Sequence, residues 1–384
     1  MSDPLPDPIY LDFNATTPIH PRVADAMRPF LDREFGNPSS GHVYGRRARE
    51  AVERARAQVA DLLGCAPEEI LFTGGGTESN NLALRGVVKA RGDAGQHLIT
   101  TVVEHPAVER VMAHLERQGH RVTRVPVDAT GQVDPDAVAA ALEPETTLVS
   151  VMHANNEVGT VNPLPALAER LRDRDVLLHT DAAQSVGKIP TRVDTLGVDL
   201  LSVAGHKLYA PKGVGALYVR RGTPLAPVLH GADHERGLRP GTENLLGIVG
   251  LGEAAALAAE TLSDHAAALT ALRDRLHAAI RDGLPAGTVR LHGHVTERLP
   301  NTCNLGFRGV SAPALLEALP EVAASAGAAC HSDADAPSSV LGAMGVSPDS
   351  ARGAVRFSLG RGLTEADIDR AAVAVIRAAR TLSP

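Results

Sequence analysis

Between residues 69 and 219, short apolar segments alternate with amphipathic ones, and this alternation constrains the fold more than any other feature. Strands are predicted where the apolar segments are short, at residues 69–73, 97–103, 121–127, 147–152, 176–180, 200–203 and 215–219. Helices are predicted between them, where apolar residues recur at helical spacing, at residues 78–90, 107–118, 135–142 and 164–172. Such strands, joined by helices, form a mostly parallel sheet covered on both faces. The sequence therefore predicts an α/β fold.

The pattern of short strands alternating with helices ends at about residue 242, which indicates a second domain. A chain of 384 residues is also long for a single apolar core. The later part predicts helices at 243–282, 314–319 and 365–381, the last with Thr364 as its N-cap, and strands at 289–293, 301–307 and 355–359. Helices at 21–35 and 44–63 precede the sheet. We predict a large domain at residues 16–260 and a smaller α/β domain made of residues 1–15 and 261–384.

The charge and the cysteine content exclude several classes of function. The formal net charge is -7, which argues against a nucleic-acid surface or an anchor on anionic membranes. No apolar run reaches the ~20 residues of a membrane span, and the N-terminus lacks the basic start and apolar core of a signal peptide. The three cysteines form no CxxC pair, and no metal-binding histidine spacing occurs. We expect a cytoplasmic protein with free thiols and no metal site.

Polar residues follow five of the predicted strands at the point where each strand ends. These stretches are residues 74–79, 104–105, 154–157, 181–184 and 205–207. In parallel sheets, ligands bind at the carboxyl ends of the strands. We therefore expect the five stretches to converge on one cleft.

The first of these stretches is a glycine-rich loop that leads into a helix. Three glycines let backbone N–H groups point inward, the helix start adds positive dipole, and Thr77 adds a hydroxyl, so the loop can hold a phosphate. It matches neither the Walker A pattern nor a dinucleotide-binding GxGxxG. A tight strand-to-helix turn without a ligand explains the same glycines.

Three other strand-end residues indicate a function only when they are considered together. Lys207 alone reads as a surface lysine or as a Schiff-base lysine with a lowered pKa. Asp181 alone reads as a helix N-cap or as a partner for a pyridinium nitrogen. His105 reads as a hydrogen-bonded histidine or as a flat ring that stacks on a flat cofactor. A lysine, a carboxylate, a phosphate cradle and a stackable ring at one sheet edge are what pyridoxal phosphate requires.

Two residues of the later part are further candidates for chemistry. Cys330 lies between small residues and a polar stretch, so it reads either as a buried small apolar residue or as a reactive thiol, and its neighbours favour the reactive thiol. Cys65 and Cys303 lie in apolar or strand contexts and are predicted to be structural. Arg356 is a charge within an apolar strand, where it either pairs with a protein carboxylate or clamps a substrate carboxylate.

These residues together resemble the class V, fold-type I pyridoxal-phosphate enzymes, which include the NifS/IscS cysteine desulfurases and selenocysteine lyase. The resemblance covers essentially the whole chain. Its markers are the motifs LDFNATTP at residues 11–18, TGGGTESN at 73–80, EH at 104–105, NNE at 155–157, DAAQ at 181–184, GHK at 205–207, RPGTEN at 239–244, the stretch around Cys330 and RFSLGR at 356–361.

The resemblance implies roles for individual residues. Lys207 would form the Schiff base, His105 would stack on the ring, Asp181 would face the pyridine nitrogen and Gln184 the phenolic oxygen. The phosphate would be held by Gly76, Thr77 and His206, and by Thr242 of the other subunit of a homodimer. Asn156 and Arg356 would bind the carboxylate of the amino acid, and Cys330 would be the nucleophile.

The resemblance also implies a reaction. A cysteine desulfurase would convert L-cysteine to L-alanine and leave a persulfide on Cys330 for transfer to a possible acceptor protein. Selenocysteine lyase is the alternative, because several local spellings look more like that enzyme; another class V aminotransferase-type reaction is less favoured, since transamination needs no thiol. Two positions depart from the pattern: Pro106 follows His105, and Ala204 replaces a phosphate-binding serine of IscS-type enzymes.

Overall fold

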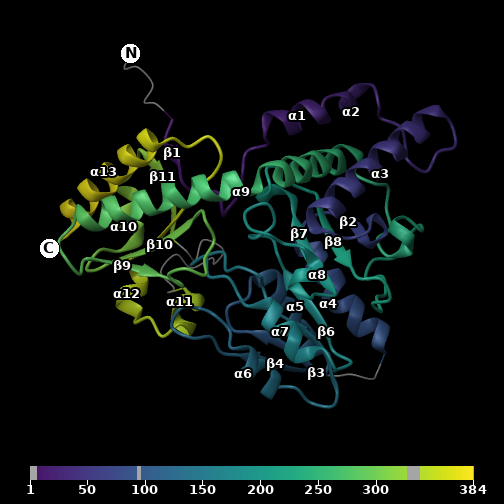
Figure 1. Ribbon diagram of the computed structural model, residues 1–384, viewed down its shortest axis with the longest axis horizontal. Coiled ribbons are helices and arrows are strands. Elements are labelled where there is room, and N and C mark those ends of the chain that lie inside the picture. The colour runs from purple at the N-terminus through teal and green to yellow at the C-terminus, as the bar shows by residue number, and fades with distance from the viewer. Residues whose placement is uncertain (1–6, 93–96, 327–337, 384) are drawn as a thin grey trace.

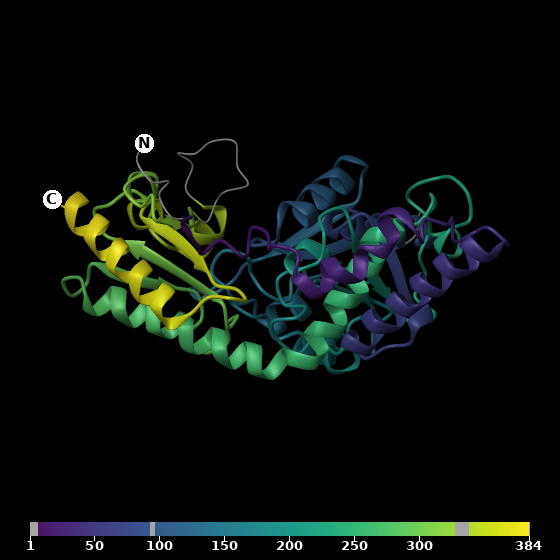
Figure 2. The ribbon, with the colours of Figure 1, turned by 90° about the horizontal axis from the view of Figure 1, so that it is seen from above.

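The computed structural model describes residues 7–92, 97–326 and 338–383 (Figure 1). Within these residues it contains a large lobe around one extended sheet and a smaller lobe around a second sheet. Helix α9 (Leu245–Asp282) runs along both lobes (Figure 2).

The large lobe is built on a mainly parallel sheet. In the described part of the chain this sheet has seven strands in the order β2-β8-β7-β6-β5-β3-β4. The strands are β2 (Ile70–Thr73), β3 (His97–Thr101), β4 (Arg121–Val125), β5 (Thr146–Ser150), β6 (Leu177–Asp181), β7 (Leu200–Ala204) and β8 (Gly215–Val219). Strand β8 pairs antiparallel with both of its neighbours. The α/β fold with a mostly parallel sheet is therefore confirmed.

Helices cover both faces of this sheet. They are α3 (Val43–Leu63), α4 (Gly76–Arg91), α5 (Pro106–Arg117), α6 (Pro135–Ala140), α7 (Leu164–Leu171) and α8 (Val193–Leu196). Successive strand residues point to opposite faces: Leu71 belongs to the apolar cluster that includes residues of α4 and α5, whereas Phe72 belongs to the cluster that includes residues of α3, α7 and α9. This double burial is why the inner strands are rich in apolar residues, whereas the edge strand β4, with the sequence RVTRV, is partly exposed.

The smaller lobe has an antiparallel sheet and its own apolar core. Its sheet order is β12-β13-β10-β9, and a short parallel pair joins β1 to β11. The strands are β1 (Ile9–Tyr10), β9 (Val289–His292), β10 (Thr302–Phe307), β11 (Val322–Ala323), β12 (Ser325–Ala326) and β13 (Ala354–Ser358). The helices are α10 (Ala312–Glu317), α11 (Ser339–Ala343), α12 (Pro348–Arg352) and α13 (Glu365–Leu382). The short elements β11, β12, α11 and α12 carry too few residues to show a period and were not predicted.

Helix α9 contributes to both apolar cores. Its first half, including Ile248 and Leu251, packs with the large lobe, and its second half, including Leu276 and Ile280, packs with the smaller one. By length and composition α9 could cross a membrane, but 56% of its most apolar window is buried inside the protein. It contacts α3, α13 and α1 (Pro21–Met27), as a core helix does. The predicted domain boundary at residue 260 falls inside α9, and the domain limits stay a prediction.

Two predicted helix ends can be compared directly with the structure. The predicted N-cap Thr364 is confirmed, because its side chain accepts a hydrogen bond from the amide of Asp367 in a capping box. The single helix predicted at residues 21–35 is wrong. It is divided into α1 (Pro21–Met27) and α2 (Pro29–Asp32), since Pro29 has no N–H to donate to the preceding turn.

Candidate active site

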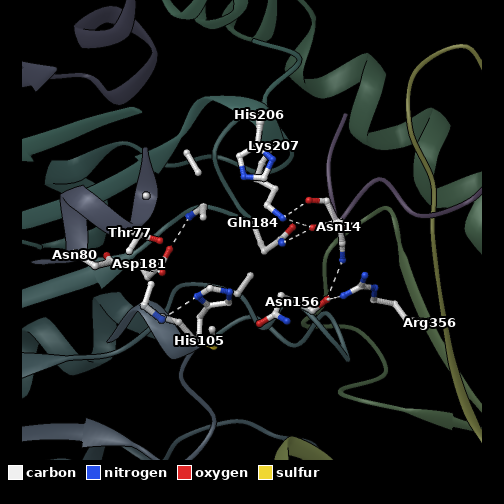
Figure 3. Close-up of a pocket in the computed structure, with 17 residues that line it drawn as sticks. Asn14, Thr77, Asn80, His105, Asn156, Asp181, Gln184, His206, Lys207 and Arg356 are labelled. Atoms are coloured by element: carbon white, nitrogen blue, oxygen red, sulfur yellow. Dashed lines mark hydrogen bonds between the residues drawn. The ribbon is translucent and has the colours of Figure 1, made fainter. Parts of the chain in front are cut away.

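The ends of strands β2, β3, β5, β6 and β7 converge on one cavity of about 370 Å³ (Figure 3). The predicted convergence of the five polar stretches is thus confirmed. Nine residues predicted for the site line this cavity: Gly76, Thr77, His105, Asn156, Asp181, Gln184, His206, Lys207 and Arg356. Arg356 comes from the smaller lobe, so the cavity lies between the lobes.

The start of α4 forms one end of the cavity. Gly75, its N-cap, has φ 142° and ψ 179°, a conformation that side-chain-bearing residues avoid. The backbone amides of Gly76, Thr77 and Glu78 make no hydrogen bond within the described residues. A Cβ on Gly76 would lie 3.2 Å from that of Ala204, so both positions are small where the backbone approaches β7. Unpaired amides at a helix start suit a phosphate.

Asp181 is held by two donors at the end of β6. Its Oδ1 accepts from the amide of Ala183 at 2.9 Å, and its Oδ2 accepts from Nδ2 of Asn80 at 2.7 Å. Asn80 is fully buried in α4 and was not predicted. The sequence feature that could have identified Asn80 is a polar residue on the apolar face of a helix. The two bonds fix the carboxylate at the cavity wall, and the turn-capping interpretation of Asp181 is compatible with this position.

His105 presents its imidazole to the cavity from the start of α5 (Figure 3). Its Nδ1 accepts from the amide of Ala107 at 3.1 Å, which leaves the ring proton on Nε2. Burial lowers the pKa of His105 below its ordinary value, so the ring is neutral near pH 7. A neutral, fixed and flat ring is suited to stacking.

Glu104, next to His105, is a buried residue that does not line the cavity. Its Oε1 accepts from the hydroxyl of Thr101 at 2.7 Å and from the amide of Met152 at 2.9 Å. Burial raises its pKa to about 8, so it is mostly protonated at neutral pH. It ties the end of β3 to the end of β5 and so supports the cavity wall.

Lys207 projects into the cavity from the short 3-10 turn Gly205–Lys207 that follows β7. Its Nζ donates to the backbone carbonyls of Asn14 and Ala15, the latter at 2.7 Å. The segment that precedes α1 therefore holds the amine in place.

His206 lies beside Lys207, and its Nδ1 is 3.1 Å from the hydroxyl of Thr16. Burial, with the nearby charge of Lys207 as a second cause, lowers the pKa of His206 to about 4. With Thr16 as the donor, the proton of the neutral ring lies on Nε2, which can then donate to an anion in the cavity.

A network around Asn14 connects the cavity to both lobes. The carbonyl oxygen of Asn14 accepts from Nε2 of Gln184 at 3.0 Å, and its side chain contacts Lys188, Asn301 and Thr302. Lys188, which was not predicted, is buried next to the cavity and its Nζ donates to Oε1 of Gln184 at 2.8 Å. The signal for Lys188 was a lysine four residues after Gln184 in an apolar stretch. Nothing in the sequence indicated that Asn14 reaches Lys188.

Arg356 is anchored by protein groups as well as facing the cavity. Its Nη2 lies 2.7 Å from Oδ1 of Asp12, and its Nη1 donates to the carbonyl of Asn156 at 3.1 Å. The interpretation of Arg356 as a partner of a protein carboxylate is therefore correct for the structure. Its Nε is buried and has no partner among the described residues.

The other two predicted site residues are Thr242 and Cys330. Thr242 is exposed in the segment before α9 and is not among the residues that line the cavity, and Cys330 lies outside the described residues. The two described cysteines are poor nucleophiles, because burial raises the pKa of Cys65 to about 12 and that of Cys303 to about 11.

The chain is similar over nearly its full length to members of one protein family. The model of the family described as aminotransferase class-V matches residues 9–371. A cysteine desulfurase IscS of Dictyoglomus turgidum is 45% identical over 98% of this chain and 96% of its own. A solved structure of a NifS-like protein has a TM-score of 0.90 at 37% identity, with 96% of this chain and 98% of that chain covered. A structure described as SspA in complex with cysteine has a TM-score of 0.81 at 36% identity, with 91% and 98% covered.

Proposed function

This chain belongs to the class V aminotransferase family, and we propose that it acts as a pyridoxal-phosphate-dependent cysteine desulfurase. The reaction takes sulfur from L-cysteine, releases L-alanine and leaves a persulfide on Cys330. The proposal is carried by one observation: the amine of Lys207, the ring of His105, the carboxylate of Asp181 and the unpaired amides of α4 share one cavity.

The residues of the cavity fit pyridoxal phosphate. The amides of Gly76 and Thr77 and Nε2 of His206 are donors suited to the phosphate, and Asp181 is a carboxylate suited to a protonated ring nitrogen. When bound, the cofactor supplies an aldehyde that condenses with amines and a ring that stabilises negative charge on the substrate's α-carbon. Because Ala204 offers no hydroxyl, the phosphate contacts from within this chain would come from the α4 amides, Thr77 and His206.

Two further steps, proton removal and sulfur transfer, are assigned to Lys207 and Cys330. Lys207 would hold the cofactor through Nζ, and the same amine would take the α-proton of the substrate, since it lies in the same cavity. The thiolate of Cys330 then forms a bond to the substrate sulfur. The Cβ–S bond breaks with its electron pair on carbon, which is protonated, so cysteine and a thiol become alanine and a persulfide.

Cys330 is assigned as the nucleophile by comparison with the other two thiols. The thiolate is the reactive form of cysteine, and Cys65 and Cys303, with raised pKa values, are almost wholly protonated at neutral pH. Cys330 is the remaining cysteine of the sequence, and the residues that follow it are polar.

The substrate carboxylate is assigned to Arg356 and Asn156, which face the cavity from opposite lobes. The relatives with near full-length coverage are named cysteine desulfurases, and one solved neighbour is described with cysteine bound. These names support cysteine as the substrate and give the selenocysteine lyase alternative no support.

We further propose a homodimer in which Thr242 reaches the phosphate of the other subunit. In support, Thr242 is exposed, and the nearby Arg239 donates to Oε1 of Glu78 at 2.7 Å, at the start of α4. The segment that carries Thr242 is thereby fixed beside the start of α4 of its own chain, and the exposed Thr242 is left to contact a second subunit. We also propose that the persulfide sulfur passes to an acceptor protein. The enzyme is proposed to act in the cytoplasm.

The deciding experiment supplies purified protein with pyridoxal phosphate, L-cysteine and a thiol reductant, and measures sulfide and alanine. We expect equal amounts of both products, with loss of sulfide release in Cys330→Ser and little change in the control Cys65→Ser. Full cysteine turnover by Cys330→Ser would refute the role of Cys330. Release of selenium from selenocysteine by a wild-type protein that leaves cysteine intact would establish the lyase alternative.

A further inference from the structure

We propose that Lys188 is a positioning residue whose amine fixes the side-chain amide of Gln184 so that its NH₂ group, and not its oxygen, serves the cavity. Lys188 does not line the cavity, whereas Gln184 does. Lys188 therefore acts on the site through Gln184 and not by touching a ligand.

The hydrogen bonds leave only one orientation of the Gln184 amide. Its Oε1 accepts from Nζ of Lys188 at 2.8 Å, and its Nε2 donates to the carbonyl of Asn14 at 3.0 Å. If the amide were rotated by half a turn, NH₂ would face the amine and the oxygen would face a carbonyl. The contact with Asn14 would then be repulsive, because a carbonyl oxygen cannot donate, and the hydrogen bond that Lys188 donates to Oε1 would be lost.

The surroundings of Lys188 match a neutral amine. Its side chain is 5% exposed, and its Nζ has two acceptors among the described residues, Oε1 of Gln184 and, at 3.2 Å, Oδ1 of Asn14. Two N–H groups of a neutral amine satisfy these acceptors, whereas the third proton of an ammonium would be buried without one. Burial first, and the charges of Lys207 and Arg356 next, lower the pKa of Lys188 well below its ordinary value.

The consequence for the site follows from the geometry of Nε2. One of its two protons is bound to Asn14, and the other is available to an acceptor in the cavity. Lys188, together with the carbonyl of Asn14, thus holds Gln184 so that it offers a donor to a negatively charged oxygen. Under the proposed function, on which this step rests, that oxygen is the phenolic oxygen of pyridoxal phosphate bound to Lys207.

The test compares wild type with Lys188→Met, which keeps the length of the side chain and removes its donors. The near-visible absorption of the bound cofactor is titrated with pH. We expect its midpoint to rise by about one pH unit in Lys188→Met, because a lost donor to a charged oxygen makes the bound cofactor retain its proton more tightly. An unchanged midpoint would overturn the proposal.

Three further variants make the test specific. Lys89→Met removes an exposed lysine in the last turn of α4 that does not line the cavity and should leave the midpoint unchanged. Lys188→Gln, which retains an N–H donor, should shift it less than Lys188→Met. In a Gln184→Leu background, Lys188→Met should cause little additional shift, because its effect passes through Gln184. A full additional shift would show a direct charge effect and overturn the positioning role.

A second readout does not need the cofactor. In the cofactor-free protein, the losses of thermal stability caused by Lys188→Met and Gln184→Leu should be non-additive, because the two side chains share a buried hydrogen bond. A wild-type protein that takes up no pyridoxal phosphate would refute the proposed function while this coupling still supported the contact. Additive losses would overturn the inference itself.

Discussion

Nη2 of Arg356 lies 2.7 Å from Oδ1 of Asp12, although 344 positions separate the two residues in the chain. Arg356 belongs to β13 of the smaller lobe, and Asp12 to the segment that links β1 to the large lobe. The bond fixes the guanidinium at the boundary of the two lobes, with a second bond to the carbonyl of Asn156. The site is therefore assembled from both ends of the chain.

Replacement of Arg356 by lysine tests the substrate-carboxylate site. An ammonium is a point donor and cannot keep the bonds to Asp12 and Asn156 while also binding a carboxylate. We expect KM for L-cysteine to rise by about tenfold or more, with a smaller change in kcat, because one charge-assisted hydrogen bond is lost. Steady-state kinetics measure this, with Arg28→Lys, on an exposed ion pair, as control. An unchanged KM would remove Arg356 from the substrate site.

Lys207→Ala tests the covalent attachment of the cofactor. Borohydride reduction of wild type loaded with pyridoxal phosphate should add the cofactor's mass to the peptide that contains Lys207, because an imine is reduced to a stable amine. The variant should gain no such mass, and its turnover should fall by at least ~1000-fold, since nucleophile and base are both lost. A modified peptide containing Lys188 in place of Lys207 would contradict the assignment.

Gly75→Ala tests the phosphate cradle. The φ of 142° at Gly75 is a conformation that costs other residues about 1–3 kcal/mol. We expect cofactor affinity to fall by about tenfold, since the start of α4 must move to relieve the strain, at 1.4 kcal/mol per factor of ten. Equilibrium binding measures the affinity. In the control Gly342→Ala, the added Cβ meets nothing within 4 Å; equal losses in both variants would disprove the explanation.

The three thiols should differ in reactivity at neutral pH. With pKa values of about 12 and about 11, Cys65 and Cys303 hold only about one part in 10⁵ and 10⁴ as thiolate at pH 7. We expect iodoacetamide to modify Cys330 first, with the other two modified at least ~100-fold more slowly until the protein unfolds. Peptide mass spectrometry over time measures each site. Equal rates for all three in folded protein would refute this order.

Replacement of Glu104 by glutamine should change how the free energy of unfolding depends on pH. Burial raises the pKa of Glu104 from 4.5 to about 8 in the folded protein, so the fold favours its protonated form. Its contribution to stability is present below pH 4.5 and is lost as the pH rises towards 8, by up to about 4 kcal/mol. Glutamine does not ionise and escapes this loss.

The measurement is the free energy of unfolding of cofactor-free protein in denaturant, at pH 5 and at pH 8.5. The variant should gain stability relative to wild type at the higher pH. Taking the difference between the two proteins cancels the other groups that titrate in this range, such as the buried Glu157. A difference that does not change with pH would show that Glu104 is ionised in the fold.

The sequence by itself determined the fold class and the location of the site. Apolar strands that alternate with helices fit a sheet buried on both faces, and this pattern is local, so it can be read without the structure. The carboxyl ends of such strands meet at one edge, which is why Lys207, His105 and Asp181 could be expected together. The motifs around them indicated the cofactor.

Only the tertiary structure decided how these side chains are held. Asp12 binds Arg356, Asn14 binds Lys207 and Gln184, and Lys188 lies buried behind them. These contacts join segments far apart in the chain and from both lobes, so no local period or spacing encodes them. Their geometry follows from the packing of the smaller lobe against the large one, which brings the N-terminal segment between the two.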